Sequence, residues 1–228
     1  MPTLDWLKKE FSNGYDSGDI LSLSPDKRRR EEEEKIGGSY REVFYKCLKP
    51  FLEPDSKVLE LGPGSGSWTR AMLRYLPQGD LHVVDYQDVN QWLEPEQYNG
   101  RLSCYKVEDM SFSMFKDGYF DFFFSIGVLC HHNGDHIREI LKNSLTKMKP
   151  NAIAVHHYAD WNKLEKRGWG LNGNLPAWLK EKPDNEIWWP RNNQETMKKI
   201  CEEEGWIVEI TDMNIVERDS IICLRRPL

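Results

Sequence analysis

A glycine-rich loop, Gly62-Pro63-Gly64-Ser65-Gly66, constrains the fold of this chain more than any other feature of its sequence. The apolar run before the loop, residues 57–61, predicts a strand, and residues 68–76 after it carry apolar side chains at helical spacing. A strand, a glycine turn and a helix in this order are typical of parallel sheets that bind a ligand where their strands end. The loop therefore predicts an α/β fold with a ligand site at one edge of the sheet.

Strand-like and helix-like segments continue to alternate along the chain. The predicted strands cover residues 57–61, 81–85, 102–107, 120–126, 153–155, 207–210 and 220–224. The predicted helices cover residues 43–51, 68–76, 136–148 and 194–204. We expect a Rossmann-like, doubly wound, mostly parallel sheet of seven strands with a last antiparallel strand, in which residues 120–126 form a central strand buried on both faces.

The N-terminal residues 1–38 depart from this alternation and predict a helical cap. Ser24, Pro25 and Asp26 have the residue types of a helix start, with Ser24 as the N-cap. The basic run 27–30 then faces the acidic run 31–34 at i,i+4 spacing, which indicates a solvated helix face. Residues 39–158 are left as the ligand-binding core.

A second departure is the segment 159–193, which follows the fifth predicted strand. It holds five of the nine tryptophans, namely Trp161, Trp169, Trp178, Trp188 and Trp189. Long irregular connections in compact domains are often binding loops, and aromatic side chains give a ligand stiff contact area. We expect an aromatic lid here, the alternative being a self-packed cover of the sheet edge. Residues 194–228 then supply a C-terminal helix and a hairpin that complete the core.

Charge and composition narrow the classes of partner. The formal net charge of -6 argues against a surface that binds the phosphates of nucleic acid. No apolar run approaches the ~20 residues that span a bilayer, so we expect no membrane partner and a cytoplasmic location. The five cysteines are scattered, without a C-x-x-C pair, and are expected to be free thiols. We expect a monomer or a homodimer.

Acidic residues stand close to the ends of three predicted strands. Glu60 lies just before the glycine loop, Asp85 ends the second strand, and Asp109 follows the third. Carboxyl ends of parallel strands meet at one edge, where an acid can accept both hydroxyls of a ribose. The loop reads G-x-G-x-G with Ser67 as its sixth residue, whereas a dinucleotide site prefers G-x-G-x-x-G.

The segment 58–66, Val-Leu-Glu-Leu-Gly-Pro-Gly-Ser-Gly, resembles motif I of the class I S-adenosylmethionine-dependent methyltransferases, and the likeness extends over residues 40–150. The resemblance implies that the cofactor is S-adenosylmethionine, that Glu60 orients the loop near the methionine amino group, and that Asp85 holds the ribose. It also implies that Tyr86 flanks the adenine while Asp109 and Met110 read its amino group. The full set of implied cofactor residues is Tyr40, Glu60, Gly62, Pro63, Gly64, Gly66, Asp85, Tyr86, Glu108, Asp109, Met110, Ser125 and Ile126.

The loop after the fourth predicted strand carries adjacent histidines, His131 and His132. It is similar to the paired-histidine loop of small-molecule and sugar O-methyltransferases. An imidazole, with an unperturbed pKa of about 6.5, suits removal of a proton from an alcohol or phenol. We expect one of the pair to be the general base, the alternative being that both only pack the loop.

A small-molecule acceptor is expected beside these histidines. Alternation along a strand sends His156 and His157 to opposite faces, so that only one can point inward. His131, His132, His157 and Asp160 could together bind a divalent metal, but we favour a site without one. The expected acceptor-binding residues are His157, Tyr158, Trp161, Trp188 and Trp189.

The segment 188–193 resembles segments of methyltransferases found beside sugar and glycan pathways, which favours a hydroxyl acceptor on a sugar or natural product. An amine acceptor and a metal-assisted O-methyltransferase stay open. Two further alternatives are a nicotinamide-dependent oxidoreductase, which would require a Tyr-x-x-x-Lys pair that the sequence lacks after the fourth strand, and a non-catalytic cofactor-binding partner subunit.

Overall fold

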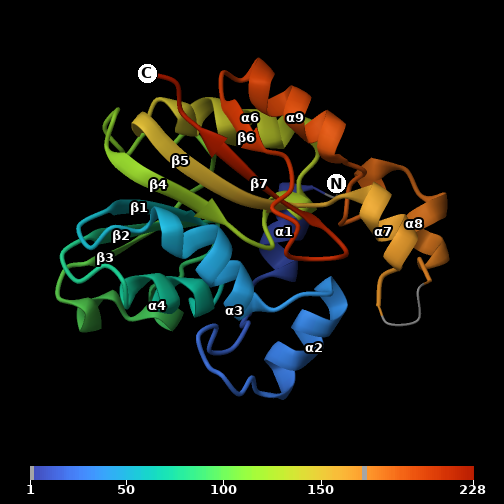
Figure 1. Cartoon of the computed structure of the whole chain (residues 1–228), viewed down its shortest axis with the longest axis horizontal. Coiled ribbons are helices and arrows are strands. Elements are labelled where there is room, and N and C mark those ends of the chain that lie inside the picture. Colours follow the sequence, from blue (N-terminus) through green and yellow to red (C-terminus); the bar gives the residue numbers. More distant parts are fainter. Residues whose placement is uncertain (1–2, 171–173) are drawn as a thin grey trace.

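The computed structural model describes residues 3–170 and 174–228. Its centre is a seven-stranded sheet with the order β3-β2-β1-β4-β5-β7-β6 (Figure 1). The strands are β1 (Lys57–Leu61), β2 (Asp80–Asp85), β3 (Leu102–Lys106), β4 (Phe120–Ser125), β5 (Met148–Tyr158), β6 (Ile207–Ile210) and β7 (Ser220–Arg225). Strands β1 to β5 pair in parallel, and β7 lies antiparallel between β5 and β6. The predicted Rossmann-like fold is therefore confirmed.

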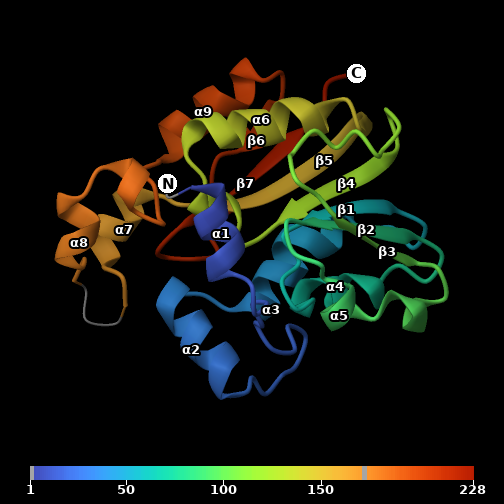
Figure 2. The same cartoon turned by 180° about the vertical axis from the view of Figure 1, so that it is seen from behind.

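Helices cover both faces of the sheet, as Figures 1 and 2 show together. On one face lie α6 (Gly134–Leu145) and α9 (Gln194–Glu203), and on the other lie α3 (Tyr40–Val43) and α4 (Ser67–Leu73). The remaining helices are α1 (Leu4–Glu10), α2 (Lys27–Ile36), α5 (Asn90–Leu93), α7 (Trp161–Arg167) and α8 (Ala177–Glu181). Of the helices that the structure describes, none is long and apolar enough to span a bilayer.

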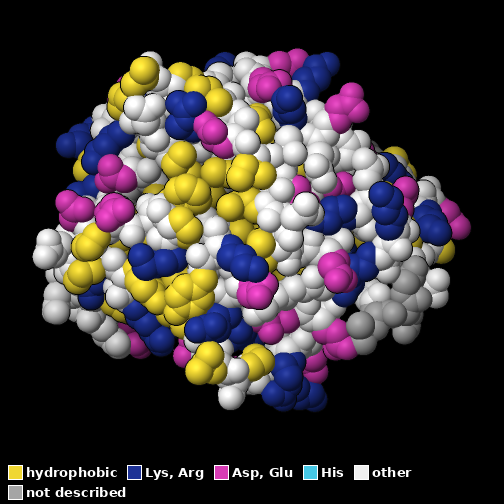
Figure 3. Space-filling view, viewed as in Figure 1, with side chains coloured by type: hydrophobic (Ala, Val, Ile, Leu, Met, Phe, Trp, Pro, Cys, Tyr) yellow, Lys and Arg dark blue, Asp and Glu magenta, His cyan; other side chains and the backbone are white. Residues whose placement is uncertain are grey.

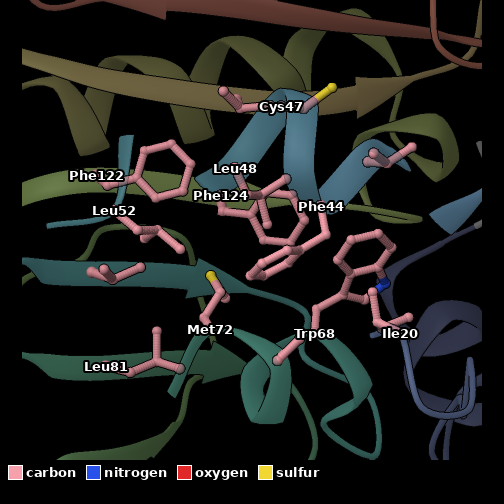
Figure 4. Packing of buried hydrophobic residues seen from close by; sticks show 14 of the residues in the cluster. Ile20, Phe44, Cys47, Leu48, Leu52, Trp68, Met72, Leu81, Phe122 and Phe124 are labelled. Carbon is pink, nitrogen blue, oxygen red and sulfur yellow. The ribbon is translucent and has the colours of Figure 1, made fainter. Parts of the chain in front are cut away.

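The core is formed by the two faces of the central strand β4. Phe122 and Phe124 point to the side of α3 and α4, where they pack with Phe44 and Trp68 (Figure 4). Phe123, between them, belongs to the cluster beneath α6 and α9. Strand alternation thus explains why this strand is apolar on both faces.

The predicted helices differ in detail from the structure. The helix predicted over 68–76 ends earlier, at Leu73 of α4, and the one predicted over 136–148 ends at Leu145 of α6, because β5 already begins at Met148. The expected helix 43–51 is split, because α3 continues into a π-helical turn (Phe44–Leu48) and a 3-10 turn (Lys49–Phe51) that contains Pro50. Helix α2 begins after Asp26 rather than Ser24, since the Asp26 carboxylate accepts a hydrogen bond from the Arg29 amide at 2.8 Å. Proline at position 25 lies outside the helix.

The charged run in α2 is only partly the solvated face that its spacing suggests. Arg29 is buried, donating to the carbonyls of Asp19 and Ser22 at 2.7 and 2.8 Å and to Glu33 at 2.9 Å. Lys27 and Glu31 form the exposed i,i+4 pair that the spacing predicts, at 3.8 Å. The run therefore has a buried part, in which Arg29 connects α2 to the preceding loop, and a solvent-exposed part. On the face seen in Figure 3, basic and acidic side chains of the described residues are interspersed.

Candidate active site

A cavity of about 540 Å³ lies where β1, β2, β4 and β5 end. Its size is in the range typical of small-molecule sites. The N-terminal segment and the aromatic insertion cover it. Of the residues that the sequence assigned to the cofactor, the base or the acceptor, the following line it: Tyr40, Gly62, Pro63, Gly64, Asp85, Tyr86, Met110, Ile126, His131, His132, His157, Trp188 and Trp189.

The glycine loop forms one wall of the cavity in a conformation that requires glycine. Gly62 and Gly64 have φ values of +67° and +55°, a region that other residues rarely adopt. A Cβ at Gly62 would lie 2.4 Å from the Val128 side chain, and one at Gly64 would lie 2.5 Å from the Tyr15 carbonyl oxygen. Gly66, outside the lining, has its place at the start of α4, where it is the N-cap. The backbone conformation and these close contacts therefore leave no room for a side chain at Gly62 or Gly64.

Glu60 lies beneath the loop and does not line the cavity. It is 2% exposed and accepts a hydrogen bond from the Thr69 hydroxyl at 2.6 Å, which joins β1 to α4. Burial raises its pKa to about 8, so the carboxyl group is mostly protonated at neutral pH in the ligand-free protein.

Asp85 stands at the end of β2 and faces the cavity. Burial raises its pKa to about 6, although the Gln87 amide donates a hydrogen bond to it at 2.8 Å. Beside it, the ring of Tyr86 lines the cavity and carries the Lys8 ammonium 5.6 Å from its centroid. A carboxylate and an aromatic ring side by side fit a ribose and a base.

The end of β3 departs from the implied site. Glu108 is exposed and forms an ion pair with Lys8 of the N-terminal helix. Asp109 is also exposed, and its carboxylate accepts from the Ser111 amide at 2.9 Å in a local turn. Met110 is buried and does line the cavity. The structure therefore brings one of these three residues, Met110, to the cavity wall.

Of the two implied residues at the end of β4, only one reaches the cavity. Ile126 lines the cavity, whereas Ser125 is fully buried behind it with its hydroxyl 2.8 Å from Nδ1 of His156. Burial lowers the pKa of His156 to about 3, so this imidazole is neutral. His156 and His157 point to opposite faces of β5, as strand alternation predicts, and only His157 lines the cavity.

His131 has the geometry of a proton acceptor. Its Nδ1 lies 2.8 Å from the Trp188 carbonyl oxygen, which can only accept, so Nδ1 carries the proton and Nε2 keeps its lone pair. Among the described residues Nε2 has no hydrogen-bond partner, and the ring lines the cavity between Phe11 and Trp188. Burial lowers its pKa to about 4, which keeps it neutral at physiological pH.

His132 also lines the cavity but is less well placed. It is 6% exposed, and its buried Nδ1 has no hydrogen-bond partner among the described residues. Burial lowers its pKa to about 3. Since no described residue fixes the tautomer of this ring, His132 lacks the defined lone pair that the Trp188 contact gives to His131.

A buried triad that the sequence analysis did not identify adjoins His157. Asp219 lies 3.2 Å from Nε2 of His157 and 2.8 Å from Nε of Arg218, and its other oxygen accepts from the Trp189 indole at 3.2 Å. Arg218 lines the cavity. The sequence does contain an indication of this cluster, because the charged pair Arg218-Asp219 stands directly before an apolar strand. Charged residues are rarely buried unless they are paired or functional.

Two expected acceptor residues have structural contacts instead. Tyr158 is fully buried and donates its hydroxyl to the Thr211 carbonyl at 2.9 Å, and Trp161 donates its indole N–H to the Trp189 carbonyl at 3.1 Å. Neither lines the cavity. Asp160 caps α7 and accepts from Ser220 at 2.7 Å.

The idea of a metal bound by His131, His132, His157 and Asp160 finds no counterpart in this arrangement. The described residues contain no group of three or more His, Cys, Asp or Glu side chains that could hold a metal ion.

The N-terminal segment contributes a second set of residues that the sequence analysis missed. Trp6, Lys8, Phe11 and Tyr15 all line the cavity, although the segment was expected only to be a cap. Their signal in the sequence is weak, because a short amphipathic helix has no fixed partner until the chain folds.

The sheet, the glycine loop and the cavity at the strand ends define a protein of the class I, Rossmann-like methyltransferase type. Residues 29–209 match the model of the methyltransferase domain family, and the chain belongs to that family. The resemblance found in the sequence is thereby confirmed. Comparison with curated proteins gives no match.

Solved structures share the fold. A SAM-dependent methyltransferase from Aquifex aeolicus is 17% identical, with a TM-score of 0.61 over 93% of this chain and 99% of that one. The PH0226 protein from Pyrococcus horikoshii is also 17% identical, with a TM-score of 0.62 over 93% and 95%. A phosphoethanolamine N-methyltransferase from Haemonchus contortus, in complex with S-adenosylhomocysteine, is 15% identical with a TM-score of 0.61 over 83% and 53%.

Proposed function

We propose that this protein is an enzyme that uses S-adenosylmethionine to methylate a hydroxyl group of a small polar molecule, such as a sugar or natural product, with His131 as the general base. The observation that carries the proposal is the hydrogen bond of 2.8 Å between Nδ1 of His131 and the Trp188 carbonyl. It leaves the Nε2 lone pair free at the wall of the cavity beside the glycine loop.

The half of the cavity formed by β1 and β2 fits the cofactor. Gly62 and Gly64 line this half in conformations and contacts that leave no room for a Cβ, and the Asp85 carboxylate can accept from two ribose hydroxyls. Tyr86 and Met110 would flank the adenine, while Tyr40 and Ile126 would line the methionine side. When bound, the sulfonium of S-adenosylmethionine supplies an electrophilic methyl group.

The half formed by β4, β5 and the aromatic insertion fits the acceptor. His131 would accept the hydroxyl proton on Nε2 as the oxygen attacks, and the Trp188 carbonyl would stabilise the resulting imidazolium through Nδ1–H. Trp188 and Trp189 line the same space and give it an apolar wall. In this proposal the chain's residues hold the acceptor and remove its proton.

The test is turnover of S-adenosylmethionine, followed as S-adenosylhomocysteine release, over a panel of sugars and phenols and their matched amines. We expect a hydroxyl acceptor, and His131→Gln should lower kcat by about 10²–10⁴ while the cofactor still binds. His136→Gln is the control, because His136 lies outside the cavity lining in contact with Asn133.

Each other outcome selects an alternative. Turnover of amines alone, unaffected by His131→Gln, would make the protein an N-methyltransferase. Turnover that a chelator abolishes would make it metal-assisted, and cofactor binding without turnover of any acceptor would favour a partner subunit.

We also propose a cytoplasmic location. All five cysteines are free in the structure and four of them are buried, which suits a reducing compartment. Localisation of a tagged full-length chain would test it, and a secreted product would contradict it.

A further inference from the structure

Arg218 occupies the acceptor half of the cavity. It lies in the loop before β7, whose first residue, Ser220, pairs with Tyr158 at the end of β5. In the strand order β3-β2-β1-β4-β5-β7-β6, this places Arg218 on the opposite side of β4 from Asp85. Its side chain is 6% exposed and lines the cavity. It is therefore a buried cation next to the aromatic insertion.

Two tryptophans and one carboxylate hold the guanidinium in place. Its central carbon lies 4.5 Å from the ring centroid of Trp169 and 4.8 Å from that of Trp189. Its Nε donates to Asp219 at 2.8 Å. Neither Nη1 nor Nη2 has a hydrogen bond to any residue that the structure describes. The four N–H donors at the end of the guanidinium thus have no acceptor among the described residues, and Arg218 lines the cavity.

Both oxygens of the Asp219 carboxylate already have partners within the protein. Burial works to raise its pKa, but Arg218 and His157 together hold the pKa below its usual value. Its oxygens receive Nε of Arg218, the indole of Trp189 and the nearby Nε2 of His157. Asp219 therefore fixes the orientation of Arg218 through Nε alone and does not bind Nη1 or Nη2.

Several other charged residues at the cavity wall have partners of their own. On α2, Glu31 pairs with Lys27 at 3.8 Å and Glu32 with Lys35 at 2.9 Å. Arg28, also on α2, donates to the Asp16 carbonyl at 2.6 Å. Among the described lining residues, Arg218 thus combines deep burial with unused donors.

We propose that the acceptor carries an anionic group, a carboxylate or a phosphate, which the Nη1 and Nη2 donors of Arg218 bind. A planar guanidinium matches these groups with two parallel hydrogen bonds, and burial between indole rings strengthens them. The inference rests on the proposed function, since it assigns the acceptor chemistry of the same cavity. A purely structural ion pair would instead be expected to satisfy the donors within the protein.

The experiment compares three ligands of similar shape: benzoate, phenyl phosphate and the neutral benzamide. Each is titrated calorimetrically into the full chain, with and without S-adenosylhomocysteine. We expect at least one anion to bind more tightly than benzamide by about tenfold or more. The better of the two anions identifies carboxylate or phosphate as the group recognised.

Variants then connect the preference to Arg218. Arg218→Met should abolish the preference for the anion while leaving benzamide and S-adenosylhomocysteine binding within about twofold, and Arg218→Lys should keep only part of it. If Arg218→Met fails to fold because Asp219 is left unpaired, the double variant Arg218→Met/Asp219→Asn removes both charges. Arg191→Met is the matched control, since Arg191 stacks on Trp161 at 4.7 Å outside the cavity lining.

Equal binding of anions and benzamide by the native chain, or an anion preference that survives in Arg218→Met, would overturn the inference. A loss of S-adenosylhomocysteine binding in Arg218→Met would also overturn it, because Arg218 would then belong to the cofactor site. Failure of the native chain to bind S-adenosylhomocysteine would contradict the proposed function, whereas the titrations without that ligand would still test Arg218.

Discussion

The backbone oxygen of Tyr15 accepts two hydrogen bonds from Ser65, one from its amide at 2.9 Å and one from its hydroxyl at 3.1 Å. Next to them, the Ser67 hydroxyl bonds to the Asp16 carboxylate at 2.7 Å and accepts from the Ser17 amide at 2.9 Å. The N-terminal segment is thus fastened directly to the glycine loop. It forms part of the proposed cofactor site and is more than a cap on the sheet.

Gly64→Ala should disturb this junction. The new Cβ would lie 2.5 Å from the Tyr15 oxygen, which cannot give way without moving the N-terminal segment. We expect S-adenosylhomocysteine affinity to fall about tenfold or more, which is about 1.4 kcal/mol, because the displaced Tyr15 lines the same cavity. Gly118→Ala, with φ +64° and open space around it, is the control that carries strain without a clash. Equal affinities of the two variants would disprove the role of the junction.

Asp85→Asn should weaken the binding of S-adenosylhomocysteine without lowering the stability of the folded protein. Because burial raises the folded-state pKa to about 6, the ionised carboxylate lowers the stability of the ligand-free protein as pH rises through that value. At pH above about 7 the ligand-free variant should melt no lower than the native chain, yet bind S-adenosylhomocysteine more weakly.

The affinity of the native chain for S-adenosylhomocysteine should also fall as pH drops below about 6, where Asp85 becomes protonated. Asp85→Asn should lose this pH dependence. The exposed Asp88, which is held by Asn90, supplies the control Asp88→Asn. A native affinity that stays constant from pH 7 to pH 5, within about twofold, would contradict the ribose assignment.

Glu60→Gln tests the buried carboxyl group under the loop. With a folded-state pKa of about 8, Glu60 contributes stability that is present below its unfolded pKa and is lost as pH rises through 8. Between pH 7 and 9 the native chain should lose about 1.4 kcal/mol more unfolding free energy than Glu60→Gln. Denaturant unfolding of both proteins at the two pH values measures it, and parallel losses would show that Glu60 is ionised throughout.

The rate at saturating cofactor should report the low pKa of His131. Since the imidazole titrates at about 4, kcat should stay level from pH 8 down to about pH 5. A fall in kcat with a midpoint near 6.5 would mean that an unperturbed histidine acts instead. The same profile recorded on His132→Gln should be unchanged.

The sheet could be predicted because its pattern is local. Alternation and glycine spacing determine β1, β2 and β4 whatever surrounds them, and the end of β2 follows directly at Asp85. The end of β3 could not be predicted in the same way. Whether Asp109 faces the cavity depends on a turn in which the Ser111 amide competes for its carboxylate.

The residues of the N-terminal segment and of the loop before β7 that line the cavity could not be predicted for a different reason. Phe11 and Tyr15 come from the end of the first helix and the loop after it, where Phe11 is the C-cap, and Arg218 comes from the loop before the last strand. These segments meet only through long-range packing, which no local pattern encodes. The position of Arg29 in a buried hydrogen-bond network, within a run that resembles a solvated face, has the same origin.

The most direct test of the account is calorimetric titration of the purified chain with S-adenosylhomocysteine in the presence of a chelator. The account predicts one-to-one binding in the micromolar range that is weakened by Asp85→Asn and unaffected by Asp88→Asn. The absence of binding to the native chain, or equal binding by all three proteins, would contradict the assignment of the cavity as a cofactor site.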